Sequence, residues 1–405
     1  MNKREVFRRI LNENFDFSGQ VCMDSKLAKK GDIFFAIRGG NKYIEEVIKK
    51  GAYPIYDCDK DFNIGKKVND TVSFMQEFAK NYRMNLNAKV IAITGSNGKT
   101  TVKDILAILL ENSYATYGNY NNHIGVPFTI LSCPIDKDYL ILEMGMSMTG
   151  EIKLLSSISL PDYSIITNIG DSHIEYLKTR ENVFKAKTEL IPYTKSKVIV
   201  NGKDEYLKTL EKALKVVLDN DVIIDDKGTS FLYNNNKYHT NLYGKHNAEN
   251  ISLCIAVLNE MGVSNFESKL DNIKLTSMRF ELLNQGDNVI INDAYNAAPK
   301  SVESSLETLN QIFKDKYKVV ILGDMLELGE NEVKYHSNLK NVLKNIKYDK
   351  LYLYGKLMEN LKIDGAIHTM DKNFIKTEIR NLKNAVIFLK GSRGMKLEEI
   401  VEGDR

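Results

Sequence analysis

IAITGSNGKTT, residues 91–101, gives the clearest indication of local structure in the sequence. It starts as an apolar run typical of a buried strand, turns at Gly95 and Gly98, and continues into a segment whose apolar side chains share one helical face. This order of strand, glycine turn and helix is what a phosphate-binding loop requires. The glycines permit positive φ and close approach of backbone N–H groups to an anion, while Lys99 adds a positive charge. We therefore predict a loop that binds nucleotide phosphates.

The loop departs from the standard pattern GxxxxGK[ST], because the first glycine of that pattern would fall at Ile93. The alternative interpretation is a glycine-rich turn with a solvated lysine, which the flanking strand and helix argue against. In a nucleotide site, Thr100 would place its hydroxyl on Mg²⁺. The residues predicted to contact the nucleotide here are Thr94, Gly95, Ser96, Asn97, Gly98, Lys99, Thr100 and Thr101.

The apolar runs outside this stretch predict an α/β fold with parallel sheets. VIAITG, YLILEMG, YSIITNIG and KVIVNG are nearly continuous rather than alternating, which indicates strands buried on both faces. A second set, NVIIND, YKVVILGD, KLYLYG and AVIFLKGSRG, follows after residue 287. We expect three domains: a small α/β N-terminal domain (1–84), a central P-loop parallel-sheet ATPase domain (85–279) and a C-terminal Rossmann-like α/β domain (280–405).

Composition excludes several classes of partner. The 405 residues are 43% hydrophobic and 27% charged with a net charge of +3, so no basic face for nucleic acid is expected. The start of the chain lacks the apolar run of a signal peptide, and no stretch approaches the roughly 20 apolar residues of a membrane span. The four cysteines form no CxxC pair. We expect a cytoplasmic monomer without membrane insertion.

TGSNGKTT resembles the form that this loop takes in the Mur ligases, which build the peptide stem of peptidoglycan. Similar motifs follow in the family's order, so that the resemblance extends from about residue 89 to residue 398. They are NYNNHIGVP (119–127), LEMGM (142–146), TNIGDSHIEYL (167–177), GKHNAEN (244–250), MRFE (278–281), NDAYNAAP (292–299), LGDMLELG (322–329) and KGSRGMKLE (390–398).

The resemblance implies an ATP- and Mg²⁺-dependent amide ligase of peptidoglycan precursor synthesis. DAYNAAP, GDMLELG and KGSRGMKLE are most similar to the members that add D-alanyl-D-alanine to UDP-N-acetylmuramoyl-tripeptide through an acyl phosphate. Two alternatives stay open: a Mur-type ligase with a different carboxylate or amine substrate, and a regulatory ATPase without ligase activity. The sequence does not distinguish lysine from diaminopimelate as the third residue of the stem peptide.

The resemblance also assigns magnesium ligands. Glu143 ends one predicted strand and His173 follows another, and the matching family positions hold the ion. Lys187 matches a lysine that is carbamylated in the family, with Lys185 as the alternative register. The metal ligands implied in this way are Thr100, Glu143, His173 and Lys187, and the implied catalytic residues are Lys99, His173, Lys187 and Arg279.

Further positions match residues that bind ATP and the other substrates. Asn250 matches an adenine contact, Arg279 an arginine that reaches the terminal phosphates, and Asp293 and Tyr295 residues beside the ribose and adenine. The implied substrate-binding residues are Ser25, Asn121, Asn122, His123, Asn296, Lys390, Ser392 and Arg393. Each of these polar residues alone could instead be a surface group or a helix cap.

The N-terminal region departs from the family pattern. The chain has Asp24-Ser25-Lys26 where Asp-Ser-Arg is common, and the family's later Asp-Gly-His is absent. Lysine is a poorer bidentate partner than arginine, so the usual contacts to the nucleotide-sugar are in doubt.

Overall fold

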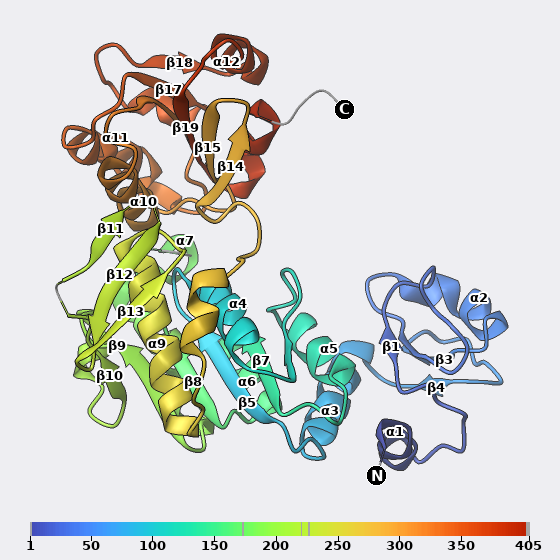
Figure 1. The fold of residues 1–405 in the computed structure, drawn as a ribbon. Coiled ribbons are helices and arrows are strands. Elements are labelled where there is room, and N and C mark those ends of the chain that lie inside the picture. Colours follow the sequence, from blue (N-terminus) through green and yellow to red (C-terminus); the bar gives the residue numbers. More distant parts are fainter. Residues whose placement is uncertain (1, 172–173, 220, 226, 402–405) are drawn as a thin grey trace. The chain divides into compact units, whose positions relative to one another are not determined.

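The computed structural model describes residues 2–171, 174–219, 221–225 and 227–401, and Figure 1 shows its elements along the chain. The chain forms two compact units. One comprises Met1–Thr94, Leu110–Ile166 and Lys185–Val198. The other comprises Gly95–Leu109, Thr167–Phe184 and Ile199–Arg405. The domain boundaries expected near residues 84 and 279 rest on the sequence pattern and stay a prediction.

The N-terminal region forms a small parallel sheet in the order β1 (Val21–Cys22), β2 (Ile33–Phe35), β3 (Tyr53–Tyr56) and β4 (Lys66–Lys67). Its helices are α1 (Lys3–Leu11), α2 (Ile44–Lys49) and α3 (Thr71–Arg83). A capping box between Asn2 and Glu5 starts α1. Phe7 of α1 packs against Phe78 and Tyr82 of α3, with ring centroids 5.1 and 5.3 Å apart. The small α/β region predicted at the start of the chain is confirmed.

The central sheet has the strand order β10 (Leu214–Val216), β9 (Lys197–Asn201), β8 (Tyr163–Ile166), β5 (Lys89–Thr94), β7 (Tyr139–Glu143) and β6 (Ser113–Ala115). β5 pairs in parallel with β7 and with β8, so the carboxyl ends of these three strands meet at one edge. Every residue of β5 after Lys89 is buried, as expected for a strand covered on both faces. The parallel sheet predicted from the continuous apolar runs is therefore confirmed.

The remaining elements of this part of the chain are α4 (Lys99–Leu109), α5 (Gly125–Ser132), α6 (Glu151–Ser159), α7 (Ile174–Leu177), α8 (Arg180–Thr188), α9 (Lys245–Met261) and the antiparallel strands β11 (Ile223–Asp225), β12 (Gly228–Tyr233) and β13 (Asn236–Thr240). Helix α4 packs against α9, where Cys254 Sγ lies 3.8 Å from Val102 O. Arg83 at the end of α3 forms a largely buried ion pair with Asp162 at 2.8 Å. No helix in the described ranges has the length and apolar character that a membrane crossing needs.

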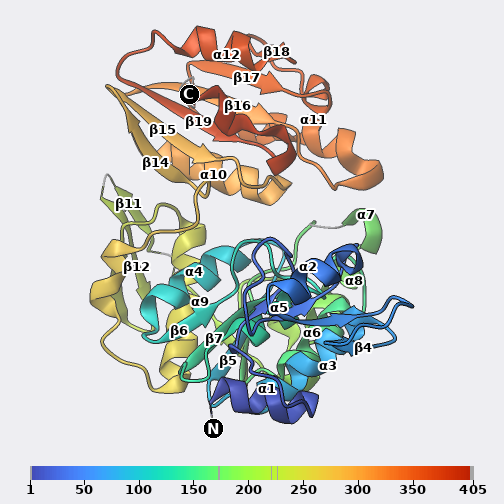
Figure 2. The same ribbon diagram turned by 90° about the vertical axis from the view of Figure 1, so that its right-hand side faces the viewer.

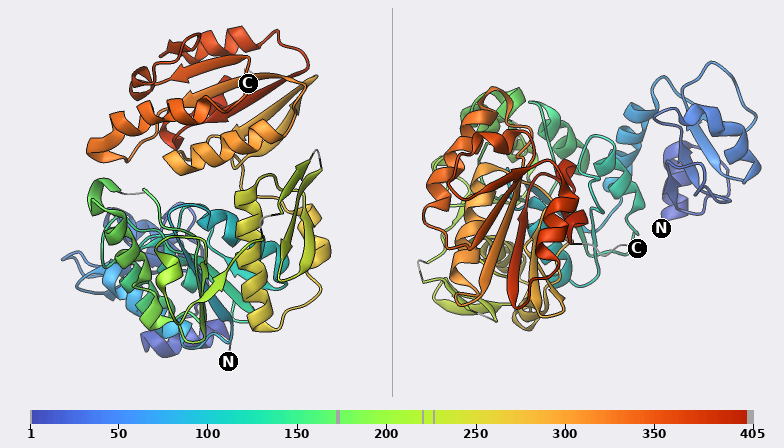
Figure 3. Two further views of the ribbon diagram at one scale, coloured as in Figure 1. Left: turned by 90° about the vertical axis from the view of Figure 1, so that its left-hand side faces the viewer. Right: turned by 90° about the horizontal axis from the view of Figure 1, so that it is seen from above.

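The C-terminal sheet has the order β14 (Glu281–Gln285), β15 (Asn288–Asp293), β19 (Ala385–Lys390), β16 (Tyr317–Gly323), β17 (Lys350–Tyr354) and β18 (Ile367–Thr369). Only β14 pairs antiparallel. Helices α10 (Pro299–Gln311) and α11 (Glu332–Leu343) pack on one face of the sheet, and α12 (Lys372–Ile379) packs on the other (Figures 2 and 3). Alternate residues of β16 enter the two cores, Val320 with α10 and α11 and Val319 with α12.

The described residues also form short 3₁₀ helices: η1 (Gly40–Tyr43), η2 (Ile191–Tyr193), η3 (Leu207–Thr209), η4 (Glu267–Asn272), η5 (Gly329–Asn331), η6 (Leu357–Asn360), η7 (Arg393–Met395) and η8 (Leu397–Ile400).

The second parallel sheet expected after residue 287 is confirmed, and its helices cover both faces as that pattern requires.

Candidate functional site

The predicted phosphate loop lies between β5 and the first turn of α4. Gly95 and Gly98 have φ of +150° and +83°, which side chains rarely adopt. A Cβ at Gly95 would lie 1.8 Å from Thr167 Oγ1. Lys99 Nζ donates to the carbonyl oxygens of Gly95 at 2.7 Å and of Ser96 at 3.4 Å, which holds its charge over the loop. The two glycines are therefore required by geometry.

A second loop, residues 167–170, braces the phosphate loop. Asn97 N–H donates to Asn168 Oδ1 over 3.0 Å, and Asn168 Nδ2 donates back to Asn97 O over 3.1 Å. Thr167 Oγ1 also donates to Asn97 O, and Gly170 N–H donates to Ser96 Oγ over 2.8 Å. Sequence reasoning did not assign Thr167 or Asn168 a role, although both lie in the TNIG segment directly after β8. These bonds fix the conformation of the loop.

Asn250 lies in the second turn of α9 and is buried against the phosphate loop. A Cβ at Gly98 would come within 2.7 Å of Asn250 Oδ1. The predicted adenine contact of Asn250 stays a prediction, and its packing against Gly98 is an additional role. His246, one turn earlier, has a shielded Nδ1 without a hydrogen-bond partner among the described residues. Burial lowers the pKa of His246 to about 4, which keeps the ring neutral at physiological pH.

Glu143 ends β7 with its side chain 3% exposed. Its backbone N–H donates to Thr116 Oγ1 over 3.0 Å, and its Oε1 accepts from Asn121 Nδ2 over 2.9 Å. Its Oε2 is shielded from solvent and has no hydrogen-bond partner among the residues that the structure describes. A buried carboxylate oxygen left in this state is costly unless a cation takes it up. Glu143 therefore fits the predicted role of a magnesium ligand.

Two further residues, His173 and Lys187, are predicted to ligate the metal. His173 lies outside the described residues. On α8, Lys187 is 1% exposed, whereas Lys185 lies on the surface. Unmodified lysines are rarely buried so completely, so burial favours Lys187 over Lys185 as the lysine that would be carbamylated. Within the described ranges, which do not include His173, no three His, Cys, Asp or Glu side chains gather at one point.

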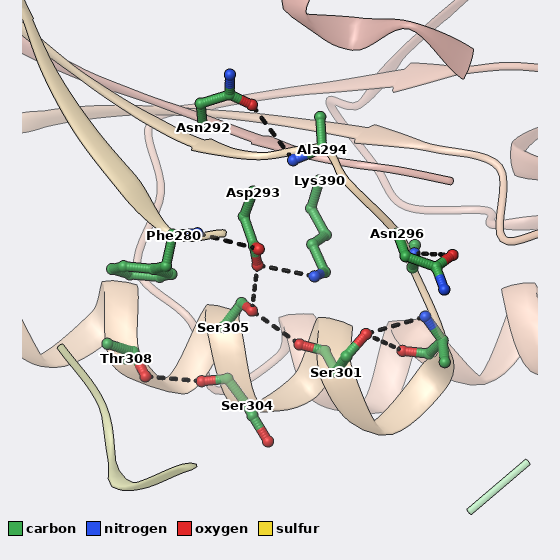
Figure 4. Close-up of polar contacts among 12 residues, drawn as sticks. Phe280, Asn292, Asp293, Ala294, Asn296, Ser301, Ser304, Ser305, Thr308 and Lys390 are labelled. Carbon is green, nitrogen blue, oxygen red and sulfur yellow. Dashed lines mark hydrogen bonds and ion pairs between the residues drawn. The ribbon is translucent and has the colours of Figure 1, made fainter. Parts of the chain in front are cut away.

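Arg279 stands in the turn before β14. Its guanidinium carbon lies 4.0 Å from the ring centroid of Tyr295, a cation–π contact, and its buried Nε has no hydrogen-bond partner in the described part of the chain. Asp293 ends β15, and both of its carboxylate oxygens are engaged within the protein. Oδ1 accepts from Phe280 N–H over 3.2 Å, and Oδ2 lies 2.6 Å from Ser305 Oγ and 2.8 Å from Lys390 Nζ (Figure 4). The predicted nucleotide contacts of Asp293 and Tyr295 stay predictions.

Three of the predicted substrate residues are buried. The carbonyl oxygen of Ser25 accepts from Lys50 Nζ over 2.7 Å. Lys390 is 4% exposed and paired with Asp293. Ser392 Oγ accepts from Leu326 N–H over 2.9 Å. Lys390 and Ser392 use their side chains in these contacts and Ser25 its backbone, so any substrate contact would come in addition to them.

The other predicted substrate residues are more accessible. Asn122 Oδ1 accepts from the backbone N–H groups of Ile124 and Gly125 at the start of α5, over 3.1 and 2.9 Å. His123 and Asn296 are exposed. Arg393, also exposed, donates to Glu398 Oε1. Asn121 is bonded to Glu143 as described above, so the structure gives it a partner that sequence reasoning did not identify.

Comparison with known proteins identifies two family regions. Residues 93–258 match the Mur ligase middle domain, and residues 278–393 match the Mur ligase, glutamate ligase domain. A MurF ligase of Thermotoga maritima, solved in complex with ADP, superposes with a TM-score of 0.87 at 26% identity, covering 94% of this chain and 96% of that chain. The predicted three-domain fold class is confirmed by this likeness.

Two relatives match along nearly the whole sequence. The UDP-N-acetylmuramoyl-tripeptide–D-alanyl-D-alanine ligase of Bacillus subtilis is 34% identical, with 94% of this chain and 92% of that protein covered. The ligase of the same name from Rickettsia prowazekii is 32% identical, with 95% and 94% covered. On the strength of these full-length matches, the chain belongs to the Mur ligase family.

Proposed function

We propose that this protein is the ATP-dependent ligase that joins D-alanyl-D-alanine to UDP-N-acetylmuramoyl-tripeptide in peptidoglycan precursor synthesis. The observation that carries the proposal is the match to the Bacillus subtilis ligase of that name, which covers 94% of this chain. The braced phosphate loop and the half-buried Arg279 support the proposal, because such a reaction needs groups that hold the phosphates of ATP.

The first step would transfer the γ-phosphoryl group of ATP to the tripeptide carboxylate. A carboxylate oxygen attacks the γ-phosphorus, the bond to the β-phosphate oxygen breaks, and an acyl phosphate and ADP result. The N–H groups of the loop and Lys99 would hold the phosphates, and Arg279 would donate to the terminal phosphate through its planar guanidinium. Most of the acceleration would come from positioning and charge stabilisation.

Magnesium would be held by Thr100 and Glu143, together with His173 and carbamylated Lys187, and it would neutralise phosphate charge when bound. The unpartnered Oε2 of Glu143 supports this assignment. The burial of Lys187 supports its assignment over Lys185, because a carbamate anion formed there would be buried beside the magnesium that neutralises it.

The second step would form the amide bond. The amine of D-alanyl-D-alanine attacks the acyl carbon, phosphate leaves with the electron pair of the C–O bond, and the amine loses its proton. We assign Asn122 and His123 to the muramoyl or peptide part, and the exposed Asn296 and Arg393 to the dipeptide carboxylate or the stem peptide. Ser25 would contact the UDP end, where the neighbouring Lys26 replaces the arginine common in the family.

Asn250, Asp293 and Tyr295 would bind the adenosine part of ATP. The nucleotide substrates and the cytoplasmic site of precursor synthesis suit a cytoplasmic enzyme, and we propose that it acts there as a monomer.

The direct test is phosphate release from ATP and Mg²⁺ with UDP-N-acetylmuramoyl-tripeptide and D-alanyl-D-alanine, omitting each component in turn. We expect release only with the complete mixture and a pentapeptide product in the mass spectrum. Release that ignores both co-substrates would indicate a regulatory ATPase instead. If the enzyme is silent with these substrates but active with another carboxylate or amine, it is a Mur-type ligase of different specificity.

A further inference from the structure

We propose that Ser305 and Lys390 are positioning residues that act through Asp293 to hold Arg279 in its working conformation. The inference rests on the proposed function, because it assigns Arg279 to the terminal phosphate of ATP. Neither Ser305 nor Lys390 needs to touch a substrate for this role. What they touch is the carboxylate that fixes the turn in which Arg279 stands (Figure 4).

The turn around Arg279 is strained. Met278 and Phe280, the residues on either side, have φ of +63° and +53°, in the left-handed region that bulky side chains avoid. Such a backbone persists only where surrounding contacts determine it, and it is found preferentially at functional sites. Here the two strained residues lie directly before and after Arg279, the arginine assigned to the phosphates.

Three hydrogen bonds to the backbone hold this turn. Met278 N–H donates to Glu281 Oε2 over 2.9 Å, Met278 O accepts from Tyr295 N–H over 3.1 Å, and Phe280 N–H donates to Asp293 Oδ1 over 3.2 Å. The side chain of Arg279 then rests on the ring of Tyr295 at 4.0 Å. Asp293 is thus the buried anchor on the far side of the turn.

Asp293 is itself held from two other elements. Its Oδ2 lies 2.6 Å from Ser305 Oγ on α10 and 2.8 Å from Lys390 Nζ at the end of β19. Asp293 and Lys390 are register partners in the parallel pair of β15 and β19, so the sheet itself places the two charges side by side. Because Asp293 is only 8% exposed, its charge depends on these partners.

Removing either partner should therefore release the turn. Without Lys390 the buried carboxylate would lose its counter-charge and would turn toward solvent, which would break the bond to Phe280 N–H. Loss of the Ser305 hydroxyl would have the same effect in milder form. Lys390 then orients Arg279, and any substrate contact expected from the sequence would come in addition to this role.

The test compares Ser305→Ala, Lys390→Met and Lys390→Arg with the matched control Ser304→Ala, which changes the neighbouring serine on the same helix. Hydrogen–deuterium exchange of peptides covering residues 278–283 reports on the Phe280 N–H without requiring activity. Steady-state kinetics and calorimetric ADP affinity are measured on the same samples, because ADP lacks the phosphate that Arg279 serves.

We expect faster exchange at residues 278–283 in Ser305→Ala and Lys390→Met, with Lys390→Arg closer to wild type. In Ser305→Ala, kcat should fall about tenfold while ADP affinity falls less, and Ser304→Ala should behave as wild type in every measurement. If Lys390→Met fails to fold, Ser305→Ala and Lys390→Arg still test the inference.

Wild-type exchange and kcat in Ser305→Ala would overturn the inference, as would faster exchange with an unchanged kcat. An equal loss of ADP affinity and kcat would also contradict it, because it would indicate general damage to the nucleotide site. A wild-type protein without ligase activity would refute the proposed function. The exchange measurement would still show whether Ser305 and Lys390 hold the turn through Asp293.

Discussion

Asn121 donates a hydrogen bond from Nδ2 to Oε1 of Glu143 over 2.9 Å, while the other carboxylate oxygen of Glu143 is buried without a partner among the described residues. The two residues come from the loop after β6 and from the end of β7. One oxygen is thus fixed by an amide and the other is left for a cation. Asn121 also accepts from Gly145 N–H through its backbone oxygen at 2.8 Å, which holds the loop against the strand end.

This contact predicts that Asn121→Ala weakens magnesium use. Without the amide, Glu143 can rotate, so the Mg²⁺ concentration for half-maximal activity should rise by about tenfold, in line with outer-shell partners of metal ligands. Titrating Mg²⁺ against ADP production measures it, with Asn119→Ala on the same loop as control and Glu143→Gln as the stronger variant. Identical Mg²⁺ dependence in all four proteins would argue that Glu143 does not ligate the ion.

The phosphate loop predicts that Gly98→Ala abolishes tight nucleotide binding. Alanine at φ +83° is strained, and its Cβ would meet Asn250 Oδ1 at 2.7 Å. Gly262→Ala is the matched control, because Gly262 has a similar φ of +71° but open space around it. We expect ADP affinity to fall at least tenfold in Gly98→Ala, the equivalent of about 1.4 kcal/mol, and to stay unchanged in Gly262→Ala. Calorimetry with ADP checks both.

The sequence predicted the phosphate loop and the strands of both large sheets because their signals are local. The buried pair of Lys390 and Asp293 could not be predicted in this way. The two residues are register neighbours in the sheet but lie almost a hundred residues apart in the sequence, so neither motif alone indicates the contact. Asn121 was similar, because its bond to Glu143 depends on how the loop after β6 folds against β7. Side chains that looked available for substrate were in these cases already committed within the protein.

Burial distinguishes two lysines two positions apart on α8. Lys187 is 1% exposed and Lys185 is on the surface, so Lys187→Ala should reduce kcat by more than a hundredfold while Lys185→Ala stays near wild type. In buffer with ¹³C-bicarbonate, we expect a carbamate carbon signal in the NMR spectrum of wild type that Lys187→Ala lacks. A signal that persists in Lys187→Ala and disappears in Lys185→Ala would assign the modification to the other register.

The partly buried His246 predicts a loss of stability on mild acidification. Its pKa is lowered from 6.5 to about 4 in the folded protein, so below pH 6.5 the unfolded chain binds a proton that the folded chain does not. The contribution of this group is therefore constant above pH 6.5 and falls by about 1.4 kcal/mol for each pH unit down to the folded pKa.

Replacing the ring should remove this dependence. His246→Gln cannot take up a proton, so its melting temperature, followed by circular dichroism between pH 7 and pH 4.5, should fall less steeply than that of wild type. His239→Gln, which alters a partly exposed histidine of β13, is the control and should keep the wild-type slope. Equal slopes for wild type and His246→Gln would mean that His246 can be protonated without unfolding, by opening of the first turn of α9 to solvent.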